Sequence, residues 1–413
     1  MRQTLVALVE PYRTFLRLPD IPAMIATAWL SRMPIGMNGL AMLLFMRETL
    51  GNFQVAGSIV GTFFVAMAVA APILGRLIDR IGPRTPLIVT GLLHPLSMIG
   101  LFVATIEGAG VPVLMAIAAL CGIVAPPVTI LTRTTWRHRF SDDHNRKMAY
   151  SIDSIMIELN FTVGPLLVAG IVAAFNARVA LATLIAISAT AVLIFFASPI
   201  LKYWQREAPV ERHLFGPLTD LRLVALFCLS FGLTFCFGLL EVGYPAYATA
   251  IGQVAFGGVL LAAISIGSAV GGFIYGALRL SMPLERQFTV TLGIISIPLF
   301  IHGVVDHRLL FVLVAFLAGV CIAPALTAQT LLVTRIAPMK YATEAFTWSS
   351  TFIITGVGVG MATGGAIAEI YNIKAPFLLA GGVIALTSVL SLMLKSGKAP
   401  QGFVEIRDIH SSS

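Results

Sequence analysis

Two residues of opposite charge lie deep inside long apolar segments, where ionisable side chains are rare. Arg32 comes 11 residues after Ile21, and Glu158 comes nine residues after Ala149. On helices these spacings place the two side chains at similar depths, roughly 13 to 16 Å from one end, since each residue adds ~1.5 Å. A charge this deep in a bilayer costs at least ~2.5–3.5 kcal/mol unless it finds a partner or a cavity. We therefore expect Arg32 and Glu158 to face each other.

Such a pair supports two kinds of chemistry, and the residues leave both open. A static ion pair would hold two helices in register. A titrating pair would let Glu158 exchange protons, with a proton affinity set by Arg32 and by desolvation. The spacing of Ser151, Ser154, Glu158 and Thr162 places these four side chains on one polar stripe of a helix.

The composition assigns most of the chain to a membrane. It is 58% hydrophobic and only 11% charged, with a mean hydropathy of +0.93, whereas soluble proteins are ~45–50% apolar and ~25% charged. A spanning helix needs ~20 mainly apolar residues. Twelve runs approach or exceed this length, at residues 21–45, 55–74, 86–105, 111–131, 149–175, 179–199, 221–247, 255–278, 288–304, 309–333, 345–370 and 376–394.

The distribution of Lys and Arg orients these runs. With both termini in the cytoplasm, the cytoplasmic segments hold 22 of the 27 basic residues and the opposite face holds four, while Arg32 lies inside the first run. Basic residues gather in cytoplasmic loops. The formal net charge of +8 is thus explained by topology and contact with anionic lipid, and we expect no nucleic-acid partner.

A short charged motif separates the second and third apolar runs. It consists of Gly75, Asp79, Arg80, Gly82 and Arg84. The order of glycine, acid, base, glycine and trailing base resembles the loop between the second and third helices of major facilitator superfamily transporters. Pro83 stands where that pattern usually has a further basic residue.

The resemblance implies an all-α polytopic membrane protein with the fold of that superfamily, in which twelve transmembrane helices form two pseudo-symmetric six-helix halves. It also implies a role for the motif as a conformational latch. Asp79 would bind the N-terminus of the eleventh helix near Ala345, where the helix dipole favours an anion. This contact would hold the halves together on the cytoplasmic side in the outward-open state.

Internal similarity supports two halves of parallel orientation. Residues 149–176 match residues 345–372 at an offset of 196, and residues 122–127 match 319–324 at an offset of 197. Repeats of this kind place a substrate site near the bilayer midplane, between the halves. We predict an N-terminal half over 1–200, a cytoplasmic linker over 201–219, a C-terminal half over 220–395 and a flexible cytoplasmic tail over 396–413.

Two further acids are candidates for a buried or gating role. Asp153 lies on a different helix face from Glu158, and we expect it to pair with Arg133 or Arg137. Glu241 lies beside Tyr244 and Tyr247, a pattern typical of the outer membrane interface, where tyrosine rings gather. We expect a solvated acid there, with a gate as the alternative.

The fifth apolar run also contains Gly164, Pro165 and Gly170. Glycine and proline followed by small residues resembles the antiporter motif of the superfamily's fifth helix, although Asn160 replaces the preceding glycine. Close helix packing is the alternative explanation.

Taken together, these features predict a secondary transporter that couples proton movement to efflux of small amphipathic molecules by alternating access. We expect a multi-pass monomer in a bacterial inner membrane, without a cofactor. The short linker lacks the long loop of the superfamily's sugar porters, which favours exporters of drugs and metabolites. A nutrient uptake symporter or facilitator of the same fold remains open. A membrane-embedded enzyme is the remote alternative, because HExxH, GxSxG, CxxC and GxxxxGK[ST] are all absent.

Overall fold

The computed structural model describes residues 13–140, 142–204, 216–278, 280–338 and 341–394. The predicted tail over 396–413 and most of the linker lie outside these residues. The first half contains α2 (Ile21–Leu50), α3 (Phe53–Ile81), α4 (Arg84–Ile106), α5 (Val111–Ile123), α6 (Val128–Arg139), α7 (Asp143–Ala174) and α8 (Ala177–Ala197). The second half contains α9 (Leu221–Ala250), α10 (Phe256–Ala277), α11 (Leu284–His302), α12 (Arg308–Val320), α13 (Ile322–Ile336), α14 (Ala342–Ile370) and α15 (Ala375–Ser391).

Every predicted apolar run corresponds to a helix or to two helices in line. The run over 111–131 breaks into α5 and α6 around Pro126 and Pro127, because proline cannot donate a helical hydrogen bond and its ring clashes with the preceding turn. The run over 309–333 breaks into α12 and α13 at Cys321. The two interruptions occupy corresponding positions in the two halves, as the internal repeat requires.

Ten helices in the described part of the chain are long and apolar enough to cross a membrane, counting α5 with α6 and α12 with α13 as single spans. The remaining two runs form α2 and α15. Helix α2 has 30 residues, but Arg32 and Asn38 interrupt its apolar sequence, and α15 has 17 residues. The observed elements confirm an all-helical, multi-span membrane protein.

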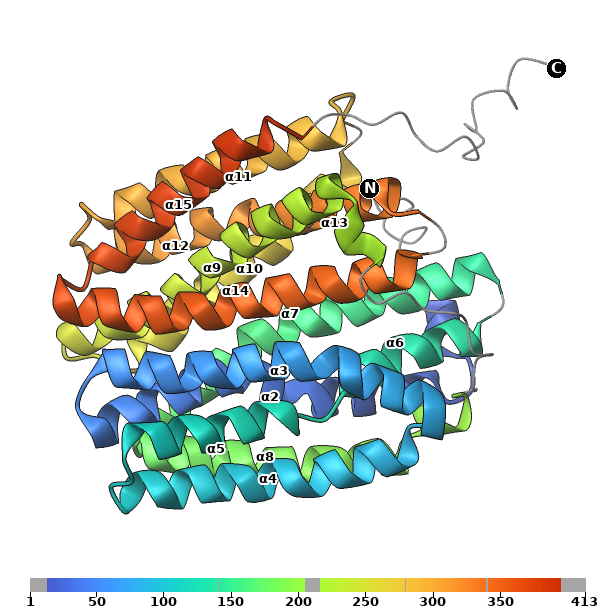
Figure 1. The fold of residues 1–413 in the computed structure, drawn as a ribbon, viewed down its shortest axis with the longest axis horizontal. Helices are drawn as coiled ribbons and strands as arrows, with labels where there is room; N and C mark the ends of the chain where they lie inside the picture. Colours follow the sequence, from blue (N-terminus) through green and yellow to red (C-terminus); the bar gives the residue numbers. More distant parts are fainter. Residues whose placement is uncertain (1–12, 141, 205–215, 279, 339–340, 395–413) are drawn as a thin grey trace.

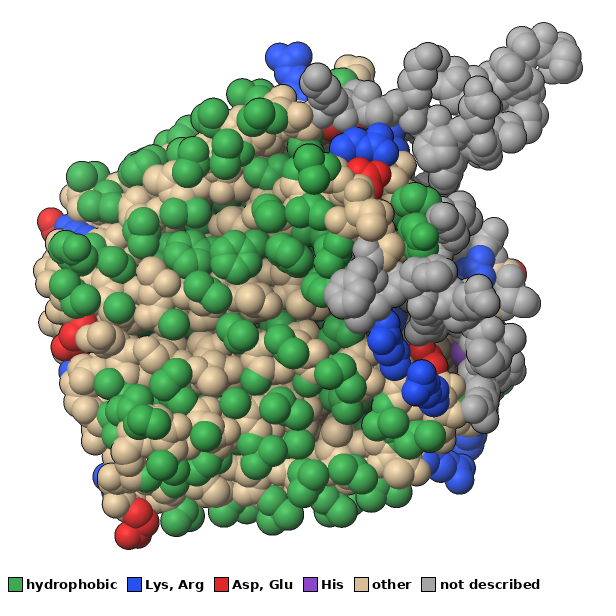
Figure 2. Space-filling view, viewed as in Figure 1, with side chains coloured by type: hydrophobic (Ala, Val, Ile, Leu, Met, Phe, Trp, Pro, Cys, Tyr) green, Lys and Arg blue, Asp and Glu red, His purple; other side chains and the backbone are tan. Residues whose placement is uncertain are grey.

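The helices run roughly parallel in one bundle, with α2 to α8 on one side and α9 to α15 on the other (Figure 1). Helix α14 packs along α3, and α10 packs along α7, so these pairs join the two halves. Apolar side chains cover the middle of the bundle, and charged side chains lie toward its ends (Figure 2). We call the end where α2 begins and α3 finishes the basic end, and the other the opposite end.

Candidate functional site

A buried charge cluster joins three helices of the first half. Nη1 of Arg32 on α2 donates a hydrogen bond to Oδ1 of Asp153 on α7 at 2.6 Å. Nε of Arg133 on α6 donates to Oδ2 of the same carboxylate at 3.1 Å. The side chains of Arg32 and Asp153 are 0% and 1% exposed, whereas that of Arg133 is 53% exposed. The predicted pairing of Arg32 with Glu158 is therefore wrong, and the predicted contact between Asp153 and Arg133 is confirmed.

The reason lies in the helix face that α7 presents to α2. A Cβ atom on Gly36 of α2 would overlap the carbonyl oxygen of Asn160, and one on Gly164 would overlap the backbone of Gly36. Residues 153, 160 and 164 follow one another at seven and four residues, so they share that face. Glu158 precedes Asn160 by two residues, which rotates it by ~160° about the helix axis. Arg32 and Glu158 therefore lie at similar depths, but Glu158 is on a face of α7 that does not point toward Arg32.

Glu158 itself is half-buried, and it forms no ion pair within the described segments of the chain. Its neighbours on the polar stripe bond to their own helix: Oγ of Ser154 donates to the carbonyl of Tyr150, and Oγ1 of Thr162 donates to the carbonyl of Glu158. The other side chains of the polar stripe therefore provide no charged partner for the Glu158 carboxyl.

Glu241 lies at a contact between the two halves. A Cβ atom built on Gly39 of α2 would be 3.1 Å from Oε2 of Glu241 on α9, and 3.9 Å from the methyl carbon of Met361 on α14. Across the described residues, the carboxyl of Glu241 has neither a hydrogen bond nor an ion pair. Glu158 and Glu241 thus differ in place: Glu158 lies on α7, and Glu241 lies between α9 and α2.

The expected aromatic belt around Glu241 is wrong. Tyr244 is 0% exposed and Tyr247 is 3% exposed. Both pack inside the second half against Phe311, and Tyr244 also packs against Phe377 and His302. The rings fill a core of the second half because neighbouring helices supply aromatic partners, and the Tyr247 hydroxyl donates to the carbonyl of Asp306 in the loop before α12.

The helix-five motif (Gly164, Pro165 and Gly170) lies on α7, the fifth spanning segment, and contributes to helix packing on two sides of α7. Gly164 lies against Gly36, and the carbonyl of Pro165 lies against Gly258 of α10, where a Cβ atom would be 2.6 Å from that oxygen. A Cβ atom on Gly170 would meet nothing within 4 Å. Two of the three motif residues therefore lie at contacts, and Pro165 takes part in the contact between the halves.

The charged motif forms the end of α3 and the start of α4. Gly82 ends α3 with φ of 86°, and its N–H donates to the carbonyl of Ile78. This left-handed conformation suits glycine and ends the helix sharply. A Cβ atom on Gly75 would have open space around it. Asp79 and Arg80 belong to the last turns of α3, while Arg84 begins α4. The proposed latch between Asp79 and the start of α14 stays a prediction.

The chain that follows α8 covers part of this loop. After the short 3-10 helix η1 (Pro199–Lys202), a ring atom of Trp204 lies 4.0 Å from the Cβ position of Gly82. The hydroxyl of Tyr203 donates to Oδ2 of Asp20 at 2.7 Å, and this hydrogen bond raises the pKa of Tyr203. The guanidinium of Arg139 lies over the same ring at 4.7 Å. The start of the linker is therefore fastened to the basic end of the first half.

Close contacts between the halves extend from the opposite end to the middle of the bundle, and none of the predicted motifs contains them apart from Pro165. The backbone N–H of Phe53 on α3 donates to Oε2 of Glu369 on α14 at 3.0 Å. Further along the same crossing, Cβ atoms on Gly61 or Gly365 would overlap backbone atoms of the partner helix. Across α7 and α10, Oγ of Ser265 donates to the carbonyl of Phe161 at 3.1 Å. Glycines spaced by four and seven residues on α3 and α14 were the available signal.

Comparisons with known proteins agree with this geometry. A sequence profile described as the Major Facilitator Superfamily matches residues 24–305 and, in a second match, residues 253–412. The chain belongs to the major facilitator superfamily. No curated protein matches its sequence. Among solved structures, a mutant of the nucleoside transporter NupG has a similar fold, with a TM-score of 0.71 and 15% sequence identity; the match covers 91% of this chain and 99% of that one.

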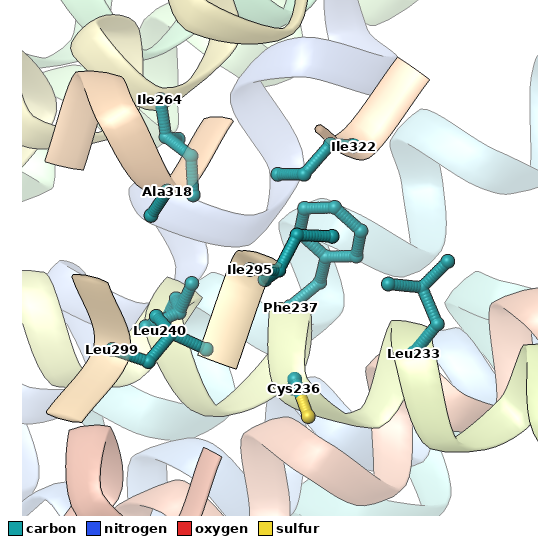
Figure 3. Close-up of a pocket in the computed structure, with 9 residues that line it drawn as sticks. All are labelled: Leu233, Cys236, Phe237, Leu240, Ile264, Ile295, Leu299, Ala318 and Ile322. Carbon is teal, nitrogen blue, oxygen red and sulfur yellow. The ribbon is translucent and has the colours of Figure 1, made fainter. Parts of the chain in front are cut away.

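Membership confirms the expected fold and identifies the protein as a secondary transporter rather than an enzyme. A substrate site in this superfamily lies between the halves. The small pocket in Figure 3 lies elsewhere: residues of α9, α10, α11, α12 and α13, all of the second half, line it, and nearly all of them are apolar. The thiol of Cys236 in its wall donates to the carbonyl of Gly232. This cavity is therefore a packing gap within one half of the transporter.

Proposed function

We propose that this member of the superfamily is a proton-coupled exporter of small amphipathic molecules that works by alternating access. Its basic end would face the cytoplasm of a bacterium, with the substrate released on the other side of the inner membrane. The Lys and Arg distribution supports this orientation, because basic residues gather on the cytoplasmic side.

The position of Glu241 carries the proposal of proton coupling. Its carboxyl belongs to the second half and lies against Gly39 of the first, so any relative movement of the halves changes its surroundings. Because this carboxyl has no ionic partner among the described residues, it can gain or lose a proton without breaking an ion pair. Glu158 is the second candidate for the same reason. We assign Asp153 a different role, since two guanidinium groups already bind it.

The conformation fits alternating access. The contact of Phe53 with Glu369 joins α3 to α14 at the opposite end, and that of Phe161 with Ser265 joins α7 to α10 near the middle of both helices. With the basic end in the cytoplasm, the contact of Phe53 with Glu369 would close the side of the membrane away from the cytoplasm. The glycines of these crossings allow close approach of two backbones, and the same contacts must separate in the outward-facing state.

The direction of transport rests on the helix-five motif. Pro165 lies at the crossing of α7 with Gly258 on α10, so this exporter-like motif occupies a contact that the transport cycle must remake. The direction could still be reversed, which would make the protein a proton symporter for uptake. Vesicle experiments distinguish the two, because an exporter exchanges protons for substrate whereas a symporter moves both the same way.

The test uses the full chain in proteoliposomes that contain a pH-sensitive dye. Small amphipathic molecules of each charge type are added to one side, and proton and molecule fluxes are recorded together. We expect opposite fluxes for at least one compound. Glu241→Gln should lose accumulation driven by a pH gradient yet keep exchange of substrate for substrate, since the amide resembles only the protonated acid. Glu107→Gln, in the loop after α4, is the control. Parallel fluxes would establish uptake instead, and gradient-driven accumulation by Glu241→Gln would move the coupling site to Glu158.

A further inference from the structure

The charge cluster of the first half has two cations and one anion, and the second cation, Arg133, is 53% exposed. One carboxylate, that of Asp153, binds both Arg32 and Arg133, and no other acid forms an ion pair with Arg32 in the described part of the chain. Charges within a membrane protein normally find compensation, because an uncompensated one is costly. Among the described residues, the buried charges of Arg32 and Asp153 balance each other, and Arg133 is a second, more exposed cation on the same carboxylate.

The cluster also has more hydrogen-bond donors than acceptors. Nε and Nη2 of Arg32 are buried and have no hydrogen-bond partner among the described residues, and the same is true of Nε1 of Trp29. Trp29 precedes Arg32 by three residues, so both side chains lie on one face of α2. Indole and guanidinium nitrogens can donate but not accept. Three neighbouring donors thus lack an acceptor.

The positions of Nε and Nη2 in the guanidinium group of Arg32 indicate which chemical group would accept their hydrogen bonds. Nε and Nη2 form one edge of the planar group, while Nη1 already bonds to Asp153. Such an edge fits two oxygens of a carboxylate or phosphate, which accept a pair of parallel hydrogen bonds. A neutral carbonyl oxygen could accept from both donors, but without the charge assistance that strengthens hydrogen bonds to a carboxylate or phosphate.

We propose that Arg32, Trp29 and Arg133 bind the anionic group, a carboxylate or a phosphate, of the transported molecule. This inference rests on the proposed transport function and narrows its substrates to amphipathic anions. Because Arg133 is 53% exposed and Arg32 is 0% exposed, the anion meets Arg133 first. It then reaches the Nε and Nη2 edge of Arg32, while Nη1 of Arg32 stays bonded to Asp153.

The test measures binding rather than transport. The purified full chain is placed in phosphatidylcholine nanodiscs and titrated calorimetrically with benzoate, phenyl phosphate, benzamide and benzylamine. These probes share an aromatic ring and differ in charge. We expect benzoate or phenyl phosphate to bind at least tenfold more tightly than benzamide or benzylamine. Equal affinity for benzoate and benzamide would overturn the proposal.

Two variants locate the site. Trp29→Phe removes one N–H donor and leaves the ion pairs intact, so it should weaken benzoate binding about tenfold, whereas Trp204→Phe should not. The double variant Arg32→Gln/Asp153→Asn removes both charges of the buried pair, so it should abolish the preference for benzoate over benzamide. The control Arg335→Gln, in α13 of the second half, should keep this preference. If the double variant does not fold, Trp29→Phe decides the question. Unchanged benzoate affinity in Trp29→Phe would contradict the proposal.

A final comparison separates a substrate from a lipid. If nanodiscs containing phosphatidylglycerol abolish benzoate binding, the site holds a lipid headgroup and the proposal fails. If benzoate binds as expected but no proton flux accompanies transport, the anion site stands and only the proposed proton coupling fails.

Discussion

Nη1 of Arg32 and Oδ1 of Asp153 lie 2.6 Å apart in an ion pair that is almost completely buried between α2 and α7. The pair fixes the first helix of the bundle to the fifth spanning segment, at a depth where neither charge could be left alone. Because the pair is buried, removing one charge strands the other, so removing both charges together should destabilise the protein less than the two single variants would suggest.

Arg32→Gln should destabilise the folded protein by about 3–5 kcal/mol, because it leaves the Asp153 carboxylate buried with only Arg133 as a partner. The double variant Arg32→Gln/Asp153→Asn should lose less than the sum of the two single variants, since the charges leave together. Chemical unfolding in detergent measures each value. Arg178→Gln is the control: its contact with Glu48 is long, at 4.0 Å, and both side chains are exposed, so a loss below about 1 kcal/mol is expected. Additive single losses would contradict coupling between Arg32 and Asp153.

Gly164→Ala should destabilise the protein by about 1–3 kcal/mol, because its Cβ atom would overlap the backbone of Gly36. Gly170→Ala is a matched control on the same helix. Its Cβ atom meets nothing within 4 Å, and alanine favours the helix by up to ~1 kcal/mol. The thermal stabilities of the two variants should therefore shift in opposite directions. Equal shifts would show that α7 does not pack on α2 through Gly164.

Gly61→Ala should open the opposite end, since its Cβ atom would overlap the carbonyl oxygen of Gly358. Spin labels at positions 52 and 372, one in each half, report the separation there. We expect longer distances and slower transport in Gly61→Ala. Gly100→Ala, on α4 with open space around its Cβ position, should match the parent protein. An unchanged distance distribution in Gly61→Ala would exclude this crossing as the closure of the opposite end.

Asp79→Asn should leave expression and helix content intact yet slow transport. The neutral side chain would weaken the latch contact that we propose with the start of α14, an interaction of a carboxylate with a helix dipole worth about 0.3–1 kcal/mol when exposed. Flux assays and circular dichroism on the same preparation measure both properties. If the loop only anchors the topology, Arg80→Gln and Arg84→Gln should disturb membrane insertion more than Asp79→Asn does, and transport by Asp79→Asn should stay normal.

The sequence by itself determined the class, the fold and the spans of this protein. Hydrophobicity decides which segments enter a bilayer, and this property adds up along the chain without reference to other helices. The offset of 196 residues between the fifth and eleventh runs likewise predicted two halves, and the Gly75 to Arg84 motif predicted the superfamily. Even the interruptions of the fourth and tenth runs were visible in Pro126, Pro127 and Pro324, although the sequence analysis treated these runs as continuous.

Only the tertiary structure decided which charges meet. Depth along a helix follows from residue number, but the face that a helix presents to its neighbour depends on packing. The contact between Gly36 and Gly164 turns Asp153 toward Arg32 and turns Glu158 away. In the same way, the aromatic cluster around Phe311 draws Tyr244 into the core, and Gly39 makes room for Glu241 between the halves. These pairings depend on contacts between residues far apart in the chain. The spacing of residues within one helix cannot predict such contacts.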